Sequence, residues 1–175
     1  ELTSAGTATQ LVITTQPSAT ASSGSAVAQQ PVIEVQDAYG NALSTDNGRA
    51  VTATVSVGGT LVGTTSIATS GGVATFTDLG IGGLIDSANN PYTLTFSATG
   101  LSSANSTAVE LTGAGAATQL VITTQPSATA TSGSAVAQQP VIEVQDAYGN
   151  PVTTDNGRAV TATVSVGGAL VGTTS

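Results

Sequence analysis

Two stretches decide the fold class, AVTATVSV at residues 50–57 and YTLTFSAT at residues 92–99. From residue 51 in the first stretch and throughout the second, apolar residues alternate with threonine or serine. A period of two places alternate side chains on the inner face of a β-sheet and the others in water. No window has a convincing helical period, so the sequence predicts an all-β fold.

Five further segments resemble strands, at residues 11–16, 31–37, 73–79, 108–112 and, more weakly, 61–68. Turn-forming residues such as Asp46-Asn47-Gly48 separate them. The sequence therefore predicts seven strands between Glu1 and Thr112. Residues 79–90 are rich in glycine and weakly patterned, and are predicted to form a long loop.

The inward-facing positions of these strands form the predicted core. They are Leu11, Ile13, Ile33, Val35, Val51, Val55, Ala74, Phe76, Tyr92, Leu94, Phe96, Val109 and Leu111. Burial of each large apolar side chain contributes roughly 1.5–3 kcal/mol. A core of this size is sufficient for one domain of about a hundred residues.

The same pattern occurs twice, because the sequence from Glu1 begins again at Glu110, so that residue i of the first copy corresponds to residue i+109. Residues 1–66 and 110–175 align without a gap and are identical at 59 of 66 positions. We therefore expect tandem repeats with a period of 109, with a complete repeat at 1–112 and the first part of a second at 113–175. We therefore expect the sequence to be part of a longer polypeptide, whose next residues resemble residues 67–109. The inner face of residues 119–172 is expected to lie bare or to be covered from elsewhere.

The composition argues against most catalytic chemistry. The chain has no Cys, His, Met or Trp, and its 2 Lys+Arg against 10 Asp+Glu give a net charge of −8. A thiolate nucleophile, an imidazole base and a Cys/His zinc site are therefore excluded. We expect no catalytic residues, no cofactor and no enzyme activity. Two arginines provide no electrostatic basis for nucleic-acid binding, and no apolar run approaches the roughly 20 residues needed for membrane insertion.

Three segments in order resemble a bacterial immunoglobulin-like domain: PVIEVQDAYGN at residues 31–41, GVATF at 72–76 and YTLTFSA at 92–98. The resemblance is to the type found in tandem in invasin- and intimin-like adhesins. Its most specific element is DAYGN, at residues 37–41 and again at 146–150. The resemblance implies an immunoglobulin-like Greek-key β-sandwich, repeated end to end in a large surface protein, with no catalytic activity.

Oxygen-bearing side chains near the DAYGN motif are candidate calcium ligands. They are Asp37, Asn41 and Asp46 in the first repeat and Asp146, Asn150 and Asp155 in the second. The alternative is that Asp37 caps a turn by accepting hydrogen bonds from backbone amides, and the sequence favours this role because the spacing of defined calcium loops is absent. Arg49 is predicted to form an exposed ion pair with Asp46.

The sequence thus favours a structural stalk or spacer module of an extracellular or cell-surface bacterial protein, whose partners are neighbouring repeats. A self-assembling subunit of an extracellular filament or sheath is the alternative. Lateral self-association would be favoured by the absence of lysine, which commonly guards sheet edges.

Overall fold

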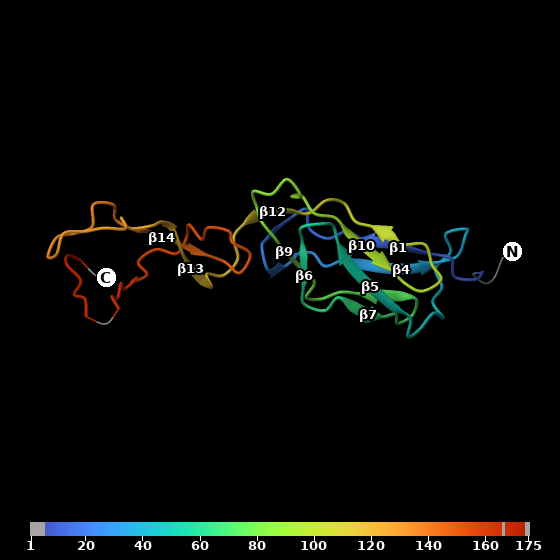
Figure 1. Cartoon of the computed structure of the whole chain (residues 1–175). Coiled ribbons are helices and arrows are strands. Elements are labelled where there is room, and N and C mark those ends of the chain that lie inside the picture. The colour runs from blue at the N-terminus through green and yellow to red at the C-terminus, as the bar shows by residue number, and fades with distance from the viewer. Residues whose placement is uncertain (1–5, 166, 174–175) are drawn as a thin grey trace. The chain divides into compact units, whose positions relative to one another are not determined.

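The computed structural model describes residues 6–165 and 167–173, which form fourteen β-strands (Figure 1). No helix occurs in this described part, and hence none that could span a bilayer. The predicted all-β class is confirmed. The chain divides into two compact units, a first unit at Glu1–Gly115 and a second unit at Ala116–Ser175.

Two antiparallel sheets make up most of the first unit. One has the strand order β1-β4-β8 and the other the order β11-β10-β5-β7. The strands of the first sheet are β1 (Gln10–Thr15), β4 (Val32–Gln36) and β8 (Val73–Thr75). Those of the second are β5 (Ala50–Val55), β7 (Ser66–Ala68), β10 (Leu94–Ser97) and β11 (Ala104–Asn105).

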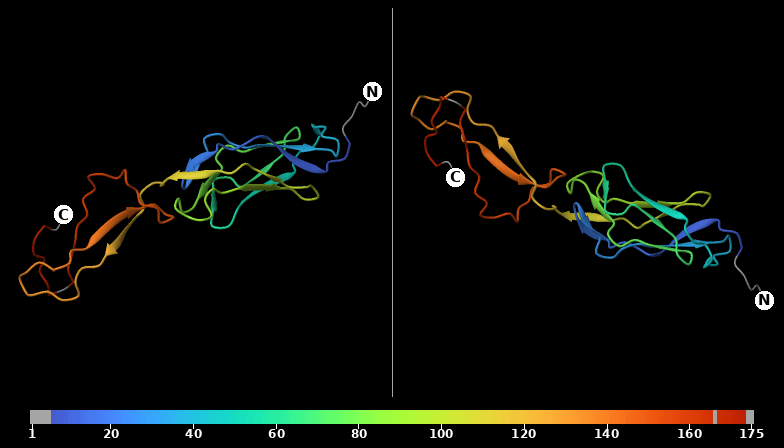
Figure 2. Two further views of the ribbon diagram at one scale, coloured as in Figure 1. Left: turned by 90° about the horizontal axis from the view of Figure 1, so that it is seen from above. Right: turned by 90° about the horizontal axis from the view of Figure 1, so that it is seen from below.

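Two smaller sheets lie toward one end of the first unit (Figure 2). In one, β2 (Thr20–Ser22) pairs in parallel with β12 (Glu110–Gly113). In the other, β9 (Gly80–Gly82) lies between β3 (Ser25–Ala26) and β6 (Thr60–Val62).

One apolar core joins the two main sheets in a sandwich-like arrangement. Ile33 from β4 and Phe96 from β10 are both fully buried in it, and the rings of Phe76 and Phe96 lie 5.3 Å apart. Eleven of the thirteen predicted core residues are buried, whereas Ile13 and Val55 are partly buried and pack against the core. The sequence pattern missed four members of the core: Val27, Ala53, Leu79 and Ile81.

The predicted long loop at residues 79–90 is wrong in its first part, because Gly80–Gly82 forms the buried strand β9. A Cβ atom on Gly80 would lie 2.2 Å from the carbonyl oxygen of Ser25, so only glycine permits this close approach of β9 to β3. Glycine has no side chain that could show the alternation of a strand. The weak strand predicted at 61–68 is also divided, into β6 and β7, which belong to different sheets.

The second unit contains the hairpin of β13 (Gln119–Thr124) and β14 (Val141–Gln145). Its register repeats that of β1 and β4, since Gln10 pairs with Gln36 and the corresponding Gln119 pairs with Gln145. Residues 159–164 have the same sequence as β5 but form no strand. In the first unit β5 lies between β10 and β7, whereas the described part of the second unit has no counterpart of β10 and none of β7.

Candidate functional site

The DAYGN motif forms a tight turn directly after β4. Asp37 is 2% exposed, and its Oδ1 accepts hydrogen bonds from the backbone amides of Tyr39 and Asn41, both at 2.9 Å. Its Oδ2 accepts from the amide of Gly6 at 2.8 Å and from Nδ2 of Asn41 at 2.9 Å. The predicted turn-capping role of Asp37 is confirmed, and the same carboxylate also holds the chain that leads into β1.

This geometry does not bring the candidate calcium ligands together. Calcium requires several oxygen atoms directed at one point, but both Asp37 oxygens are directed at N–H groups, and Asn41 turns its amide nitrogen toward Asp37. Asp46 has other partners, Arg49 and Thr69. Over residues 6–165 and 167–173 no three carboxylates gather in a way that could hold a metal ion.

The second DAYGN motif has the same internal bonds. Asp146 Oδ1 accepts from the amides of Tyr148 at 2.8 Å and Asn150 at 2.9 Å, and its Oδ2 accepts from Asn150 Nδ2 at 2.9 Å. Asp155 instead forms an ion pair with Arg158. The turn is therefore a local structure that the motif specifies by itself in both units.

The predicted ion pair between Arg49 and Asp46 is confirmed, with Nη2 2.6 Å from Oδ2. The pair is less exposed than expected, since only 9% of the Asp46 side chain is accessible, and Thr69 Oγ1 also donates to its Oδ1. Hydrogen bonds from Arg49 lower the pKa of Asp46. Arg49 Nη1 further donates to the carbonyl oxygen of Thr99 at 3.1 Å, which ties the turn before β5 to the loop after β10.

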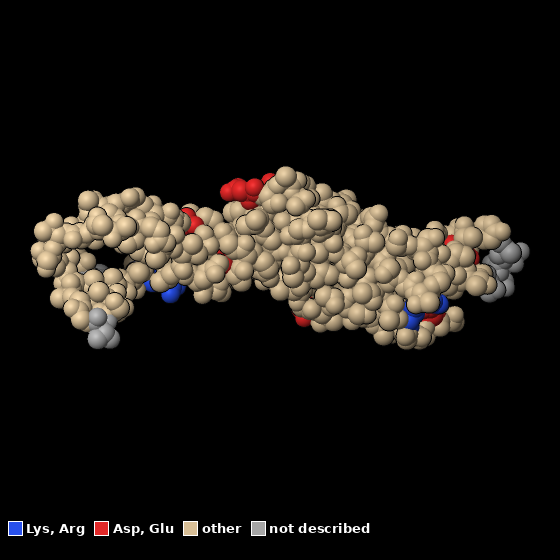
Figure 3. Space-filling view, viewed as in Figure 1, with Lys and Arg blue, Asp and Glu red and all other residues tan. Residues whose placement is uncertain are grey.

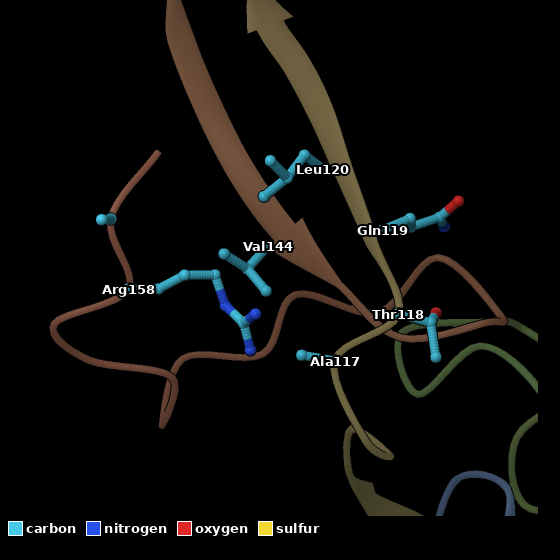
Figure 4. A pocket seen from close by; sticks show the side chains of 7 residues that line it. Ala117, Thr118, Gln119, Leu120, Val144 and Arg158 are labelled. Atoms are coloured by element: carbon cyan, nitrogen blue, oxygen red, sulfur yellow. The ribbon is translucent and has the colours of Figure 1, made fainter. Parts of the chain in front are cut away.

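The second unit contains a groove of about 260 Å³ between the start of β13 and the segment that carries Arg158 (Figure 4). Its lining residues are Ala117, Thr118, Gln119, Leu120, Val144, Arg158 and Ala159. Their counterparts in the first copy are the same amino acids at every position. In the first unit, three of these counterparts, Thr9, Leu11 and Arg49, contact residues 99–102 instead of lining a groove.

No short sequence motif predicted this groove. Its signal in the sequence is the repeat itself, because aligning the two copies identifies the residues of the first unit that correspond to the groove lining. The inner face that the sequence predicted to be bare or covered is indeed exposed, with Leu120 at 51% and Ile142 at 37%.

Charged side chains are few and scattered on the visible face of the molecule (Figure 3). This agrees with a charged fraction of 7%. Among the residues coloured on this face, Figure 3 shows no large patch of a single sign of the kind that concentrates a charged ligand.

Comparisons with known proteins add little to this geometry. No protein-family model matches the chain, and no curated protein matches it. One solved structure with a similar chain path is the crystal structure of Parabacteroides merdae β-glucuronidase with glycerol in its active site, at 11% identity and a TM-score of 0.43. That alignment covers 64% of this chain and 13% of the glucuronidase chain.

Replacement of Asp37 by asparagine is expected to destabilise the first unit at neutral pH, and the effect should diminish in acid. The hydrogen bonds from the Asn41 side chain, then from the amides of Gly6 and Asn41, hold the pKa of Asp37 well below its usual range. A carboxyl group with a depressed folded-state pKa stabilises the fold above its unfolded pKa of about 3.9, and this contribution is lost as the pH falls further. The melting temperatures of the protein and of Asp37→Asn should therefore differ most at pH 7, and the difference should shrink steadily as the pH falls below about 4. A difference that stays constant across this range would contradict the role of the Asp37 carboxylate.

Proposed function

We propose that the first unit is an immunoglobulin-like Greek-key sandwich. The strand orders support this assignment, because one sheet has the order β1-β4-β8 and the other the order β11-β10-β5 with β7 added at the edge. In the immunoglobulin fold the first, second and fifth strands share one sheet, and the third, sixth and seventh share the other. When only the strands of the two main sheets are counted in chain order, β1, β4 and β8 are the first, second and fifth, and β5, β10 and β11 are the third, sixth and seventh. The parallel pairing of β2 with β12 also joins the first and last parts of the domain.

The function that this arrangement supports best is that of a stalk or spacer module in an extracellular bacterial surface protein. The observation that carries the proposal is that the chain enters the first unit just before β1 at one end and leaves through β12 at the opposite end (Figure 1). Domains with opposite ends can be strung along a line without looping the chain back. The repeated sequence supplies the next copy directly after β12.

A short joint between copies supports the same role. Ser23 donates its amide to the carbonyl oxygen of Gly113, and Thr118 donates to that of Gln145, so the chain is held on both sides of residues 114–117. These four residues are glycine and alanine. A joint of four residues restricts the distance between copies, while its small side chains allow it to bend.

A spacer module under tension needs bonds that resist extension. When the two ends of the first unit are pulled apart, the parallel strands β2 and β12 slide in opposite directions, which loads their hydrogen bonds together instead of one after another. The Glu110 amide donates to the carbonyl oxygen of Ala19 at 2.8 Å at the start of this pair.

Single-molecule force spectroscopy of the full chain tests the mechanical role. Glu110→Pro removes the donor to Ala19, a bond that stabilises by about 1 kcal/mol, and is expected to lower the force at which the first unit unfolds. Glu110→Ala keeps the amide and should leave that force unchanged. Equal unfolding forces in both variants would contradict a force path through β2 and β12.

The alternative, a filament subunit, is favoured by the weakly charged surface of the protein. Light scattering across a wide range of protein concentrations separates the two. We expect a monomer of 16.8 kDa for a spacer, whereas growth into polymers would support a filament. The variant Ile142→Asp serves as the control, because association that it abolishes belongs to the exposed face of the second unit and not to a filament contact elsewhere.

A further inference from the structure

Every proline of the chain follows a residue with an amide side chain. Glutamine or asparagine precedes each of the six prolines, which stand at residues 17, 31, 91, 126, 140 and 151. Proline has no main-chain N–H and therefore interrupts the hydrogen bonding of a strand. An amide side chain carries both a donor and an acceptor. It can therefore supply, beside the proline, the two groups that a strand residue would otherwise supply.

In the first unit two glutamines of this kind bond to main chain that is distant in the sequence. Gln16 Oε1 accepts a hydrogen bond from the Thr107 amide at 3.0 Å. Gln30 Oε1 accepts from the Leu79 amide at 2.9 Å, and Gln30 Nε2 donates to the Leu79 carbonyl oxygen at 3.0 Å. These partners are 91 and 49 residues apart. The side chains thus join segments that the chain brings together only on folding.

Asn90 makes the most complete pairing of this kind. Its Oδ1 accepts from the Leu111 amide at 2.9 Å, and its Nδ2 donates to the carbonyl oxygen of Leu111 at 3.0 Å and to that of Ile85 at 2.8 Å. Two residues of antiparallel strands that exchange both N–H···O bonds are paired in the same pattern. The Asn90 side chain therefore takes the place of a strand residue opposite Leu111.

The main chain on this side of β12 cannot make these bonds. The Asn90 amide donates to the carbonyl oxygen of Ser87 at 3.0 Å, and Pro91 has no amide hydrogen. Beyond the proline, Tyr92 and Val109 exchange main-chain bonds of 2.8 Å and 2.7 Å. The Asn90 side chain thus continues the pairing that Tyr92 and Val109 begin.

Strand β12 is thereby paired along both of its edges. On the β2 side the Glu110 amide donates to the carbonyl oxygen of Ala19 at 2.8 Å. Successive amides of a strand point to opposite sides, so the Leu111 amide is directed away from β2. Leu111 is 2% exposed, and a buried main-chain N–H or C=O without a partner would destabilise this strand. Asn90 supplies a partner for both groups.

We propose that Asn90 is the positioning residue of the β2–β12 pair. Its side chain holds β12 in register from the opposite edge, so that tension loads the β2–β12 bonds together and does not peel β12 away from its Leu111 end. This inference rests on the proposed spacer role and on its force path through β2 and β12. Gln30 provides the comparison within the same unit, because it holds Leu79 in the same way but Leu79 is not part of that pair.

Amide hydrogen exchange of the full chain tests the pairing itself. Asn90→Ala removes both partners of Leu111 and should speed exchange of the Leu111 amide about tenfold or more relative to the amides of β5, which report general opening of the core. Asn89→Ala is the matched control, because this adjacent asparagine is exposed, and it should leave the Leu111 amide unchanged. Unchanged Leu111 exchange in Asn90→Ala would overturn the pairing.

Force spectroscopy, with the chain pulled at its two ends, separates positioning from general stability. Asn90→Ala and Gln30→Ala each remove an amide side chain that is paired with a buried leucine, so both should lower the urea concentration at which the first unit unfolds. Only Asn90→Ala should also lower the force at which that unit unfolds. An unchanged force in Asn90→Ala, or an equal loss of force in both variants, would overturn the positioning role.

A second variant keeps the test decisive if Asn90→Ala does not fold. Asn90→Asp has nearly the same shape and keeps the acceptor for the Leu111 amide, but at neutral pH it cannot donate to the carbonyl oxygens of Leu111 and Ile85. It should lower the unfolding force, whereas an unchanged force would show that Asn90 only fills space. Failure of the spacer proposal is distinguishable, because Glu110→Pro would then leave the force unchanged, while the Leu111 pairing is decided by hydrogen exchange alone.

Discussion

Replacing Phe96 or Phe76 with alanine is expected to lower the free energy of unfolding of the first unit by about 3–5 kcal/mol. Both rings are at most 1% exposed and their centroids lie 5.3 Å apart, so either truncation leaves a cavity in the centre of the core. This loss is a large share of the roughly 5–15 kcal/mol that stabilises a domain. Urea unfolding followed by circular dichroism measures it.

Two surface variants serve as controls for the loss of stability expected from the phenylalanine substitutions. Tyr39 is 89% exposed, and Tyr39→Ala should change stability by less than about 0.5 kcal/mol. Arg49→Ala removes a partly exposed ion pair and its bond to Thr99, and should cost about 1 kcal/mol. If Arg49→Ala were as damaging as Phe96→Ala, the ion-pair network and not the aromatic core would be the main support of the first unit.

The same substitution at matching positions of the two copies should have different effects on the stability of the first unit. Ile33→Asp places a carboxylate without a partner where the side chain is 0% exposed, and the desolvation of that charge is expected to unfold the first unit. Ile142→Asp changes the matching residue of the second copy, which is 37% exposed, and should leave the melting transition of the first unit unchanged.

Circular dichroism melting combined with hydrogen exchange separates these effects. Ile33→Asp should abolish protection of β4, β5 and β10 together, because they share one core. Ile142→Asp is the matched control for the chemistry of the substitution. Unfolding of the first unit by both variants, or by neither, would show that the exposure of the two copies does not differ as described.

Local patterns in the sequence predicted a large part of the fold. Alternation located most of the core, including Val35 and Leu94, because period two is a property of each strand and needs no knowledge of its neighbours. The DAYGN motif likewise predicted the Asp37 turn, since the bonds to Tyr39 and Asn41 lie within the motif itself. The bond from Gly6 to Asp37 could not be predicted, because it depends on the register of β1 against β4.

The missed elements share a physical cause. Strand β9 consists of Gly80, Ile81 and Gly82, and the close approach of β3 requires a glycine at position 80. The sequence pattern therefore predicts a loop at Ile81, although this side chain is 0% exposed. No short motif predicted the groove either, because the counterparts of its lining residues in the first copy are ordinary core and turn residues.

The all-β class, the recurrence at Glu110 of the sequence that starts at Glu1, and the inward-facing side chains of most strands all follow from the amino-acid sequence. Which of those segments form strands depends on the neighbours that the fold brings beside them. AVTATV is β5 at residues 50–55, between β10 and β7, and the identical residues at 159–164 form no strand. The reason is that the hydrogen bonds of a strand come from its neighbours, so a strand-forming sequence becomes a strand only where other segments supply the pairing and the apolar cover.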